Sequence, residues 1–176
     1  MPIIAGPFHV IVGLLLVAGV AKLVRPGATA EVAKAAGILA STWVVRIFAL
    51  VEIAAAMAAF IVGGWIPALI VGISYIVFAG FVTMLKVRGI ETAGCGCFGQ
   101  ESEDPPGSLH IVVDLVAALI AGVAAVVAVP RIATVLADQP LAGVPYIGFI
   151  ALGVWLLMVM LTDLPRLVYL TMETST

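Results

Sequence analysis

Two cysteines, Cys95 and Cys97, stand one residue apart in the stretch GCGCFG, residues 94–99, and they are the only cysteines of the chain. Glycines between and beside them permit unusual backbone angles. A disulfide that closes so small a ring is expected to be strained, and strain raises its reduction potential. Such a bond constrains too little chain to hold a fold together. The spacing therefore suits a dithiol that is repeatedly oxidised and reduced.

Three interpretations of this pair remain open. It is a redox-active dithiol, or half of a metal site, or two incidental loop cysteines. A metal would need further ligands, because two cysteines at this spacing make an incomplete set. Free cysteine is usually buried as a small hydrophobe, yet both thiols avoid the apolar segments of the chain. We therefore favour the redox pair and expect no metal site. The nearby residues that would complete a metal site are His110, Glu101, Glu103 and Asp104.

The composition is that of a membrane protein. Apolar residues make up 64% of the 176 residues and charged residues 10%, with a mean hydropathy of +1.28. A soluble domain carries about 25% charged residues, so the polar surface is too small to cover a water-soluble globule. The net charge of −2 and the lack of a basic tract give no sign of a nucleic-acid partner. We expect an integral protein of the plasma membrane, in contact with lipid.

Five apolar stretches are long enough to cross a bilayer, which takes roughly 20 helical residues. Open sheets leave edge groups unsatisfied in lipid, so the five should be helices. The first is interpreted as a retained span, because no positive segment precedes it. The mildly apolar residues 28–40 predict a short surface helix at the membrane interface. The five stretches cover about residues 7–24, 41–62, 66–87, 108–129 and 144–164.

Ionisable residues occur inside these spans. Glu52 falls at the middle of the second, where an ionised acid costs about 2.5–3.5 kcal/mol. Such residues normally face the interior of a bundle and have partners. Arg46 and Asp114 lie at similar depths, about 7–9 Å from the cysteine side, so we expect an ion pair between them. His110 lies one turn before Asp114 on the same helix face, and Lys22 ends the first span on that side.

Two roles for these buried groups stay open. They handle the protons that accompany dithiol chemistry, or they fix helix register without taking part in chemistry. His9, at the opposite end of the first span, is expected to be an interfacial histidine. Aromatic residues near the ends of the spans are expected to anchor the protein at the membrane interface. These residues are Trp43, Trp65, Tyr146 and Tyr169.

Basic residues are concentrated on one side of the predicted five-span topology. The positive-inside rule places that side, with the cysteine segment, in the cytoplasm. The cytoplasm keeps most thiols reduced, so a cycling pair fits there better than a permanent disulfide. The opposite side carries Arg131. The basic residues of the cysteine side are Lys22, Arg25, Lys34, Lys86, Arg88 and Arg166.

Several stretches together resemble a known family. GCGCFG lies before the fourth span, and AGVAKL (residues 18–23) ends the first span. FALVEIAAA (residues 48–56) places an acid in the second span, and a short hairpin joins the second span to the third. These features resemble the MauE family (methylamine utilisation protein MauE), a branch of the DoxX-like membrane proteins, over about residues 8–128. Relatives often carry an Arg-Asn pair early in the fourth span, where this chain has HIVVDL, so no basic role is carried over there.

The resemblance implies a DoxX-like four-helix bundle over residues 1–130, with residues 131–176 adding a further transmembrane helix. It also implies thiol–disulfide redox chemistry by Cys95 and Cys97, in maturation of a partner and beside a thioredoxin-like protein. No cofactor motif is recognisable, and a quinone in the bilayer is the electron acceptor that this chemistry suggests. The alternative is a non-catalytic subunit or assembly factor of a larger membrane oxidoreductase complex.

Overall fold

The computed structural model describes residues 3–38, 40–90 and 108–162, and the elements named in this part of the chain are all helical. Five helices are long and apolar enough to cross a membrane: α1 (Ala5–Val24), α3 (Thr42–Ile61), α4 (Trp65–Val87), α5 (Ser108–Val126) and α7 (Val144–Thr162). Shorter elements connect them: α2 (Pro26–Ala35), α6 (Ile132–Ala137) and the 3-10 helix η1 (Pro140–Gly143). The predicted all-α, multi-pass membrane fold is confirmed.

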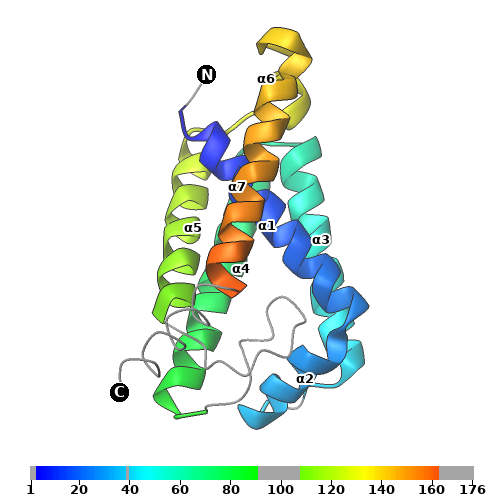
Figure 1. Cartoon of the computed structure of the whole chain (residues 1–176), viewed down its shortest axis with the longest axis vertical. Coiled ribbons are helices and arrows are strands. Elements are labelled where there is room, and N and C mark those ends of the chain that lie inside the picture. Colours follow the sequence, from blue (N-terminus) through cyan, green and yellow to red (C-terminus); the bar gives the residue numbers. More distant parts are fainter. Residues whose placement is uncertain (1–2, 39, 91–107, 163–176) are drawn as a thin grey trace, which may run out of the picture.

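Helices α1, α3, α4 and α5 share one apolar core, and α7 packs against α1 (Figure 1). The core contains large side chains of α1 and α4, such as Phe8 and Tyr75, together with alanines of α3 and α5. Gly72 of α4 brings that helix close to α5, because a Cβ there would lie 3.3 Å from the Cβ of Ala121. Small residues at helix contacts allow the close packing on which membrane bundles depend. The four helices therefore pack around one common core, and α7 contacts this bundle mainly through α1.

The outer faces of the long helices are apolar. Ile47 of α3, Ile73 of α4, Leu119 of α5 and Trp155 of α7 are each more than half exposed. In water such a surface would be a liability, whereas in a bilayer it is the expected lipid contact. The surface agrees with the membrane location that length and composition predict.

The two ends of the bundle are closed differently. At one end, Gly63 and Gly64 form the short turn between α3 and α4 with positive φ angles, and the Gly64 N–H donates to the Val129 carbonyl over 2.7 Å. At the other end, the predicted surface helix is present as α2 (Figure 1). Val32 of α2 and Ala36, which directly follows the helix, pack with Leu85 of α4. This second end is where the polar residues gather.

Candidate functional site

A fully buried ion pair joins α1 to α3. Lys22 Nζ donates to both carboxylate oxygens of Glu52, over 2.8 and 2.9 Å. The exposed fractions of the two side chains are 2% and 1%. Helical side chains lean toward the N-terminus of their own helix. Because Lys22 lies in the last turn of α1 and Glu52 at the middle of the antiparallel α3, the two side chains lean toward each other.

The close approach of α1 and α3 at this level depends on Gly19. A Cβ on Gly19 would lie 2.9 Å from Ile53 Cγ1 and 3.3 Å from Glu52 Cβ. Glycine therefore lets the two helices meet one turn before Lys22. Because α1 and α3 lie close together at this level, the extended side chain of Lys22 reaches the Glu52 carboxylate.

Aromatic rings surround the ammonium group. Lys22 Nζ lies 4.3 Å from the ring centroid of Phe78 and 5.8 Å from that of Phe48. The two rings meet edge to face, with centroids 6.0 Å apart. A cation over an aromatic face is stabilised by the ring quadrupole, more so where water is excluded. The positive charge is thus held by one carboxylate and two rings.

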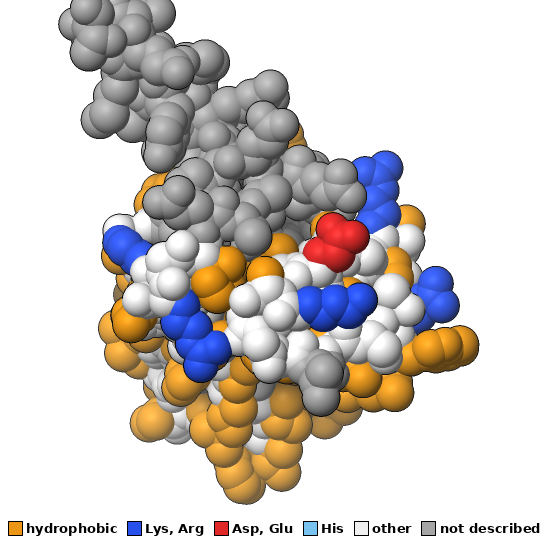
Figure 2. Space-filling view, turned by 90° about the horizontal axis from the view of Figure 1, so that it is seen from below, with side chains coloured by type: hydrophobic (Ala, Val, Ile, Leu, Met, Phe, Trp, Pro, Cys, Tyr) orange, Lys and Arg blue, Asp and Glu red, His pale blue; other side chains and the backbone are white. Residues whose placement is uncertain are grey.

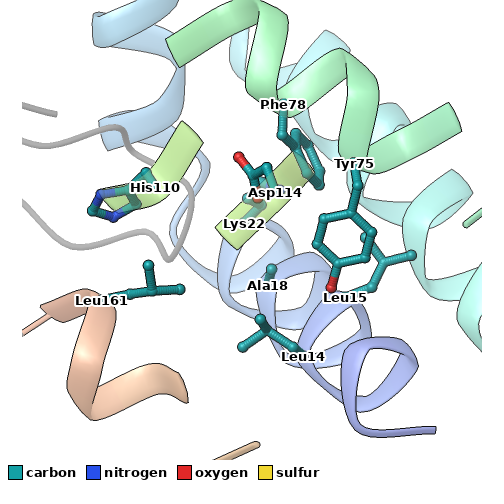
Figure 3. Close-up of a pocket in the computed structure, with 9 residues that line it drawn as sticks. All are labelled: Leu14, Leu15, Ala18, Lys22, Tyr75, Phe78, His110, Asp114 and Leu161. Carbon is teal, nitrogen blue, oxygen red and sulfur yellow. The ribbon is translucent and has the colours of Figure 1, made fainter. Parts of the chain in front are cut away.

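A small cavity lies beside the ion pair. Its volume of about 20 Å³ is enough for about one water molecule. Lys22 of α1, Tyr75 of α4 and both Asp114 and His110 of α5 contribute to its walls. Figure 3 shows Asp114, Tyr75 and Phe78 turned toward the stretch of α1 that bears Ala18 and Lys22. Tyr75 is itself fixed, because its hydroxyl donates to the Ile11 carbonyl over 2.6 Å.

The structure therefore brings together four of the five ionisable residues that the sequence singled out. Lys22 and Glu52 are buried, and Asp114 and His110 are half-buried beside them. The predicted Arg46–Asp114 ion pair is wrong. Arg46 is exposed on α3, and its guanidinium lies 5.5 Å from the ring centroid of Trp43. Arg46 lies six residues before Glu52 on α3, which is about one and two-thirds turns, so its side chain leaves the helix on another face.

Comparison with known proteins assigns the chain to a family. The family model of methylamine utilisation protein MauE matches residues 2–129. The chain belongs to the MauE family. No match was found among curated proteins or among solved structures. The predicted family is confirmed, while the wider DoxX-like relationship stays a prediction. The matched residues include α1 to α5 and both members of the ion pair, and α7 follows after them.

Cys95 and Cys97 of this MauE-family chain lie outside the described residues. What the structure does describe is the end of α4 and the start of α5, between which they stand in the sequence. Lys86 at the end of α4 donates to the Ser108 hydroxyl at the start of α5, so both attachment points lie at the same end of the bundle. Among the described residues, no cluster of three His, Cys, Asp or Glu side chains could hold a metal ion.

The end of the bundle that bears α2 is basic. Figure 2 views the molecule from this end and shows Lys and Arg side chains distributed over the described surface, with apolar side chains around the edge. Glu31 is the exposed acid of α2. This distribution follows the charge asymmetry read from the sequence. The exposed basic side chains at this end are Arg25, Lys34, Lys86 and Arg88.

Sequence reasoning misplaced His9. The predicted interfacial histidine is fully buried, and its Nδ1 lies 2.7 Å from the hydroxyl of Tyr146 on α7. Its ring also stacks on Phe60, with centroids 5.7 Å apart. The burial depends on α7 covering this face of α1, which no local pattern in the first span signals. His9 and Tyr146 therefore tie the fifth transmembrane helix to the MauE-type bundle.

Proposed function

We propose that this MauE-family chain is a membrane thiol–disulfide redox protein in which Cys95 and Cys97 exchange electrons with a thioredoxin-like partner protein. The observation that carries the proposal is the buried Lys22–Glu52 pair, with Asp114 and His110 beside it. The family name refers to methylamine utilisation. We accordingly propose that the disulfides exchanged belong to a protein matured for that use.

The chemistry balances as a two-electron, two-proton exchange. When the dithiol is oxidised, two S–H bonds break, one S–S bond forms, and two protons and two electrons leave. With a protein partner, one thiolate attacks the partner disulfide to form a mixed disulfide, which the second cysteine resolves. A quinone in the bilayer takes up the same two electrons and two protons as it becomes a quinol. Lys86 and Arg88 would favour the thiolate electrostatically.

The proposed role of the buried groups is to carry protons between the cysteine segment and the membrane interior. Asp114 and His110 can each accept and release a proton. The cavity between them and Lys22 has room for about one water molecule, which would connect α5 to the ion pair. Glu52 then marks the deepest point of this polar series. In this proposal the Lys22–Glu52 pair takes part in proton transfer, in addition to fixing the register of α1 against α3.

The decisive experiment counts reactive thiols in native membranes. A mass-tagged maleimide is applied before and after a reductant, and partners are captured in Cys97→Ser and Cys95→Ser variants. The proposal expects two extra tags after reduction and a mixed disulfide with a partner in one of the two variants. Two thiols that are always free, with no trapped partner, would contradict it. A membrane-impermeant form of the reagent tests the cytoplasmic placement of the cysteine segment.

A second function is favoured by α7. Among the described residues of α7, Ile150 and Leu161 are the buried ones, and the helix follows the residues that the family model matches. Such a helix would suit a subunit or assembly factor that contacts another membrane protein. Site-specific crosslinkers on the exposed face of α7, for example at Leu152, test this role. A crosslinked membrane protein together with permanently free thiols would favour the subunit over the redox protein.

A further inference from the structure

An apolar groove lies between α2, α3 and α4. Its volume is about 250 Å³, and a cavity of about 150 Å³ already holds a benzene molecule. Val44 and Phe48 of α3 and Val77 of α4 line the groove and are 52%, 39% and 49% exposed. In a bilayer the outer surface of these helices contacts acyl chains. The groove is therefore open to lipid, and the surface that it presents suits a hydrocarbon chain.

The groove follows the axes of α3 and α4 away from the membrane surface. Its walls extend from Val44 to Phe48 on α3 and from Phe81 to Val77 on α4, which is about one turn, or about 6 Å, on each helix. Ala33 of α2 lines the groove as well, and α2 lies across the end of the bundle (Figure 1). One end of the groove thus lies at the level of the surface helix, where lipid headgroups are found.

Arg88 lies beside this surface end of the groove. It directly follows α4, seven residues after Phe81, so it shares the groove face of that helix and lies about 10 Å nearer the membrane surface. Its guanidinium donates to the Ala36 carbonyl, and Nη1 is 3.7 Å from the position of a Cβ on Gly37. The next residue, Ile38, lines the groove. Along the chain, one residue without a side chain separates the guanidinium contact from the groove wall.

The exposed guanidinium of Arg88 suits a phosphate group. Its contact with Ala36 uses one of five N–H groups, and arginine binds phosphate oxygens through two parallel hydrogen bonds. Lys34, in the last turn of α2, adds a second exposed positive charge at this end. Glu31 stands three residues before Lys34 and offsets part of that charge. The phosphate is therefore assigned to Arg88, with Lys34 as a weaker contributor.

We propose that the groove and Arg88 together bind one anionic phospholipid. An acyl chain lies between α3 and α4, the glycerol passes Ile38, and the phosphate accepts hydrogen bonds from the guanidinium. An acidic protein would use the charge but not the groove, whereas an anionic lipid uses both. The site goes beyond the proposed redox function, because neither cysteine takes part in it.

Photolabelling of the full chain in phosphatidylcholine nanodiscs tests the acyl-chain site. The probe is a phosphatidylglycerol that bears a diazirine in one acyl chain. Labelling of α3 and α4 that unlabelled phosphatidylglycerol displaces should be largely lost in Val77→Trp, because the indole ring fills the groove. Ile73→Trp is the matched control, since Ile73 lies one turn away on α4, is 52% exposed and does not line the groove. Equal displaceable labelling of the two variants would overturn the proposal.

A phosphatidylcholine probe with the same acyl chains tests the headgroup. Its choline group cancels the phosphate charge, so the unmodified protein should prefer phosphatidylglycerol about fivefold, which corresponds to about 1 kcal/mol for one basic residue near the surface. Arg88→Gln should abolish this preference, and Arg88→Lys should keep part of it. Lys86→Gln is the control, because it removes the same charge at the same end, where Lys86 donates to Ser108 of α5.

The ratio of the two probes is measured on one preparation, so a partly unfolded fraction lowers both signals alike. Equal labelling by the two probes in the unmodified protein would mean that any phospholipid occupies the groove. An equal loss of preference in Arg88→Gln and Lys86→Gln would mean a diffuse attraction to the basic end of the bundle. Either result would overturn the assignment of an anionic lipid to this site.

Discussion

Lys22 and Glu52, thirty residues apart in the sequence, form a bidentate ion pair that is almost completely withdrawn from the surface. Either charge alone would be costly at this depth in a membrane. Together they make a neutral unit that links the last turn of α1 to the middle of α3. Lys22 also lines the water-sized cavity to which Asp114 and His110 of α5 contribute. In the proposed function, this cavity connects the ion pair to α5.

Breaking this pair should be strongly destabilising. Lys22→Met leaves the Glu52 carboxylate buried without its partner, and we expect the free energy of unfolding to fall by about 3–5 kcal/mol. The Lys22→Met/Glu52→Met double variant should recover most of that loss, because no charge is left buried. Unfolding in mixed micelles, followed by circular dichroism, measures both. Losses that simply add in the double variant would contradict a direct pair.

Gly19 should tolerate no side chain. Gly19→Ala places a methyl group 2.9 Å from Ile53 Cγ1 and 3.2 Å from the Ala49 carbonyl oxygen, which forces α1 away from α3. We expect a loss of about 1–3 kcal/mol, typical of overpacking. Gly80→Ala is the control, since a Cβ there meets nothing within 4 Å. Thermal unfolding of the two variants in detergent should separate them, and equal midpoints would count against close packing at Gly19.

The sequence predicted the helical membrane fold well, but it predicted poorly which ionisable side chains pair inside that fold. Apolar length alone located the five spans, because lipid leaves helices as the structure for each. Depth along a span also marked Glu52, Lys22 and Asp114 as interior groups. Depth does not tell which way a side chain leaves its helix, and for that reason Arg46 was assigned to the interior. The burial of His9 depends on contacts with α7, some 137 residues later, which no local pattern encodes.

The His9–Tyr146 contact should hold the start of α7 against α1. Tyr146→Phe keeps the ring but removes the hydroxyl that lies 2.7 Å from His9 Nδ1. Loss of one partner of a buried polar group costs about 1–3 kcal/mol, so α7 should detach more readily. Limited proteolysis at the α6–α7 connection provides the measurement. Ile147→Ala, at a half-exposed neighbouring position, is the control and should be cleaved at the rate of the unmodified protein.

Arg46 should act independently of Asp114. Its guanidinium packs near Trp43 on the outer surface of α3, and an exposed cation–π contact contributes about 0.5–1 kcal/mol. Arg46→Gln should therefore lower the free energy of unfolding by no more than that amount. In a double-mutant cycle with Asp114→Asn, the two changes should add to within about 0.5 kcal/mol, as expected for residues without a shared contact. A coupling energy well above this value would mean that the two side chains meet, and the assignment of Arg46 to the outer surface would have to be abandoned.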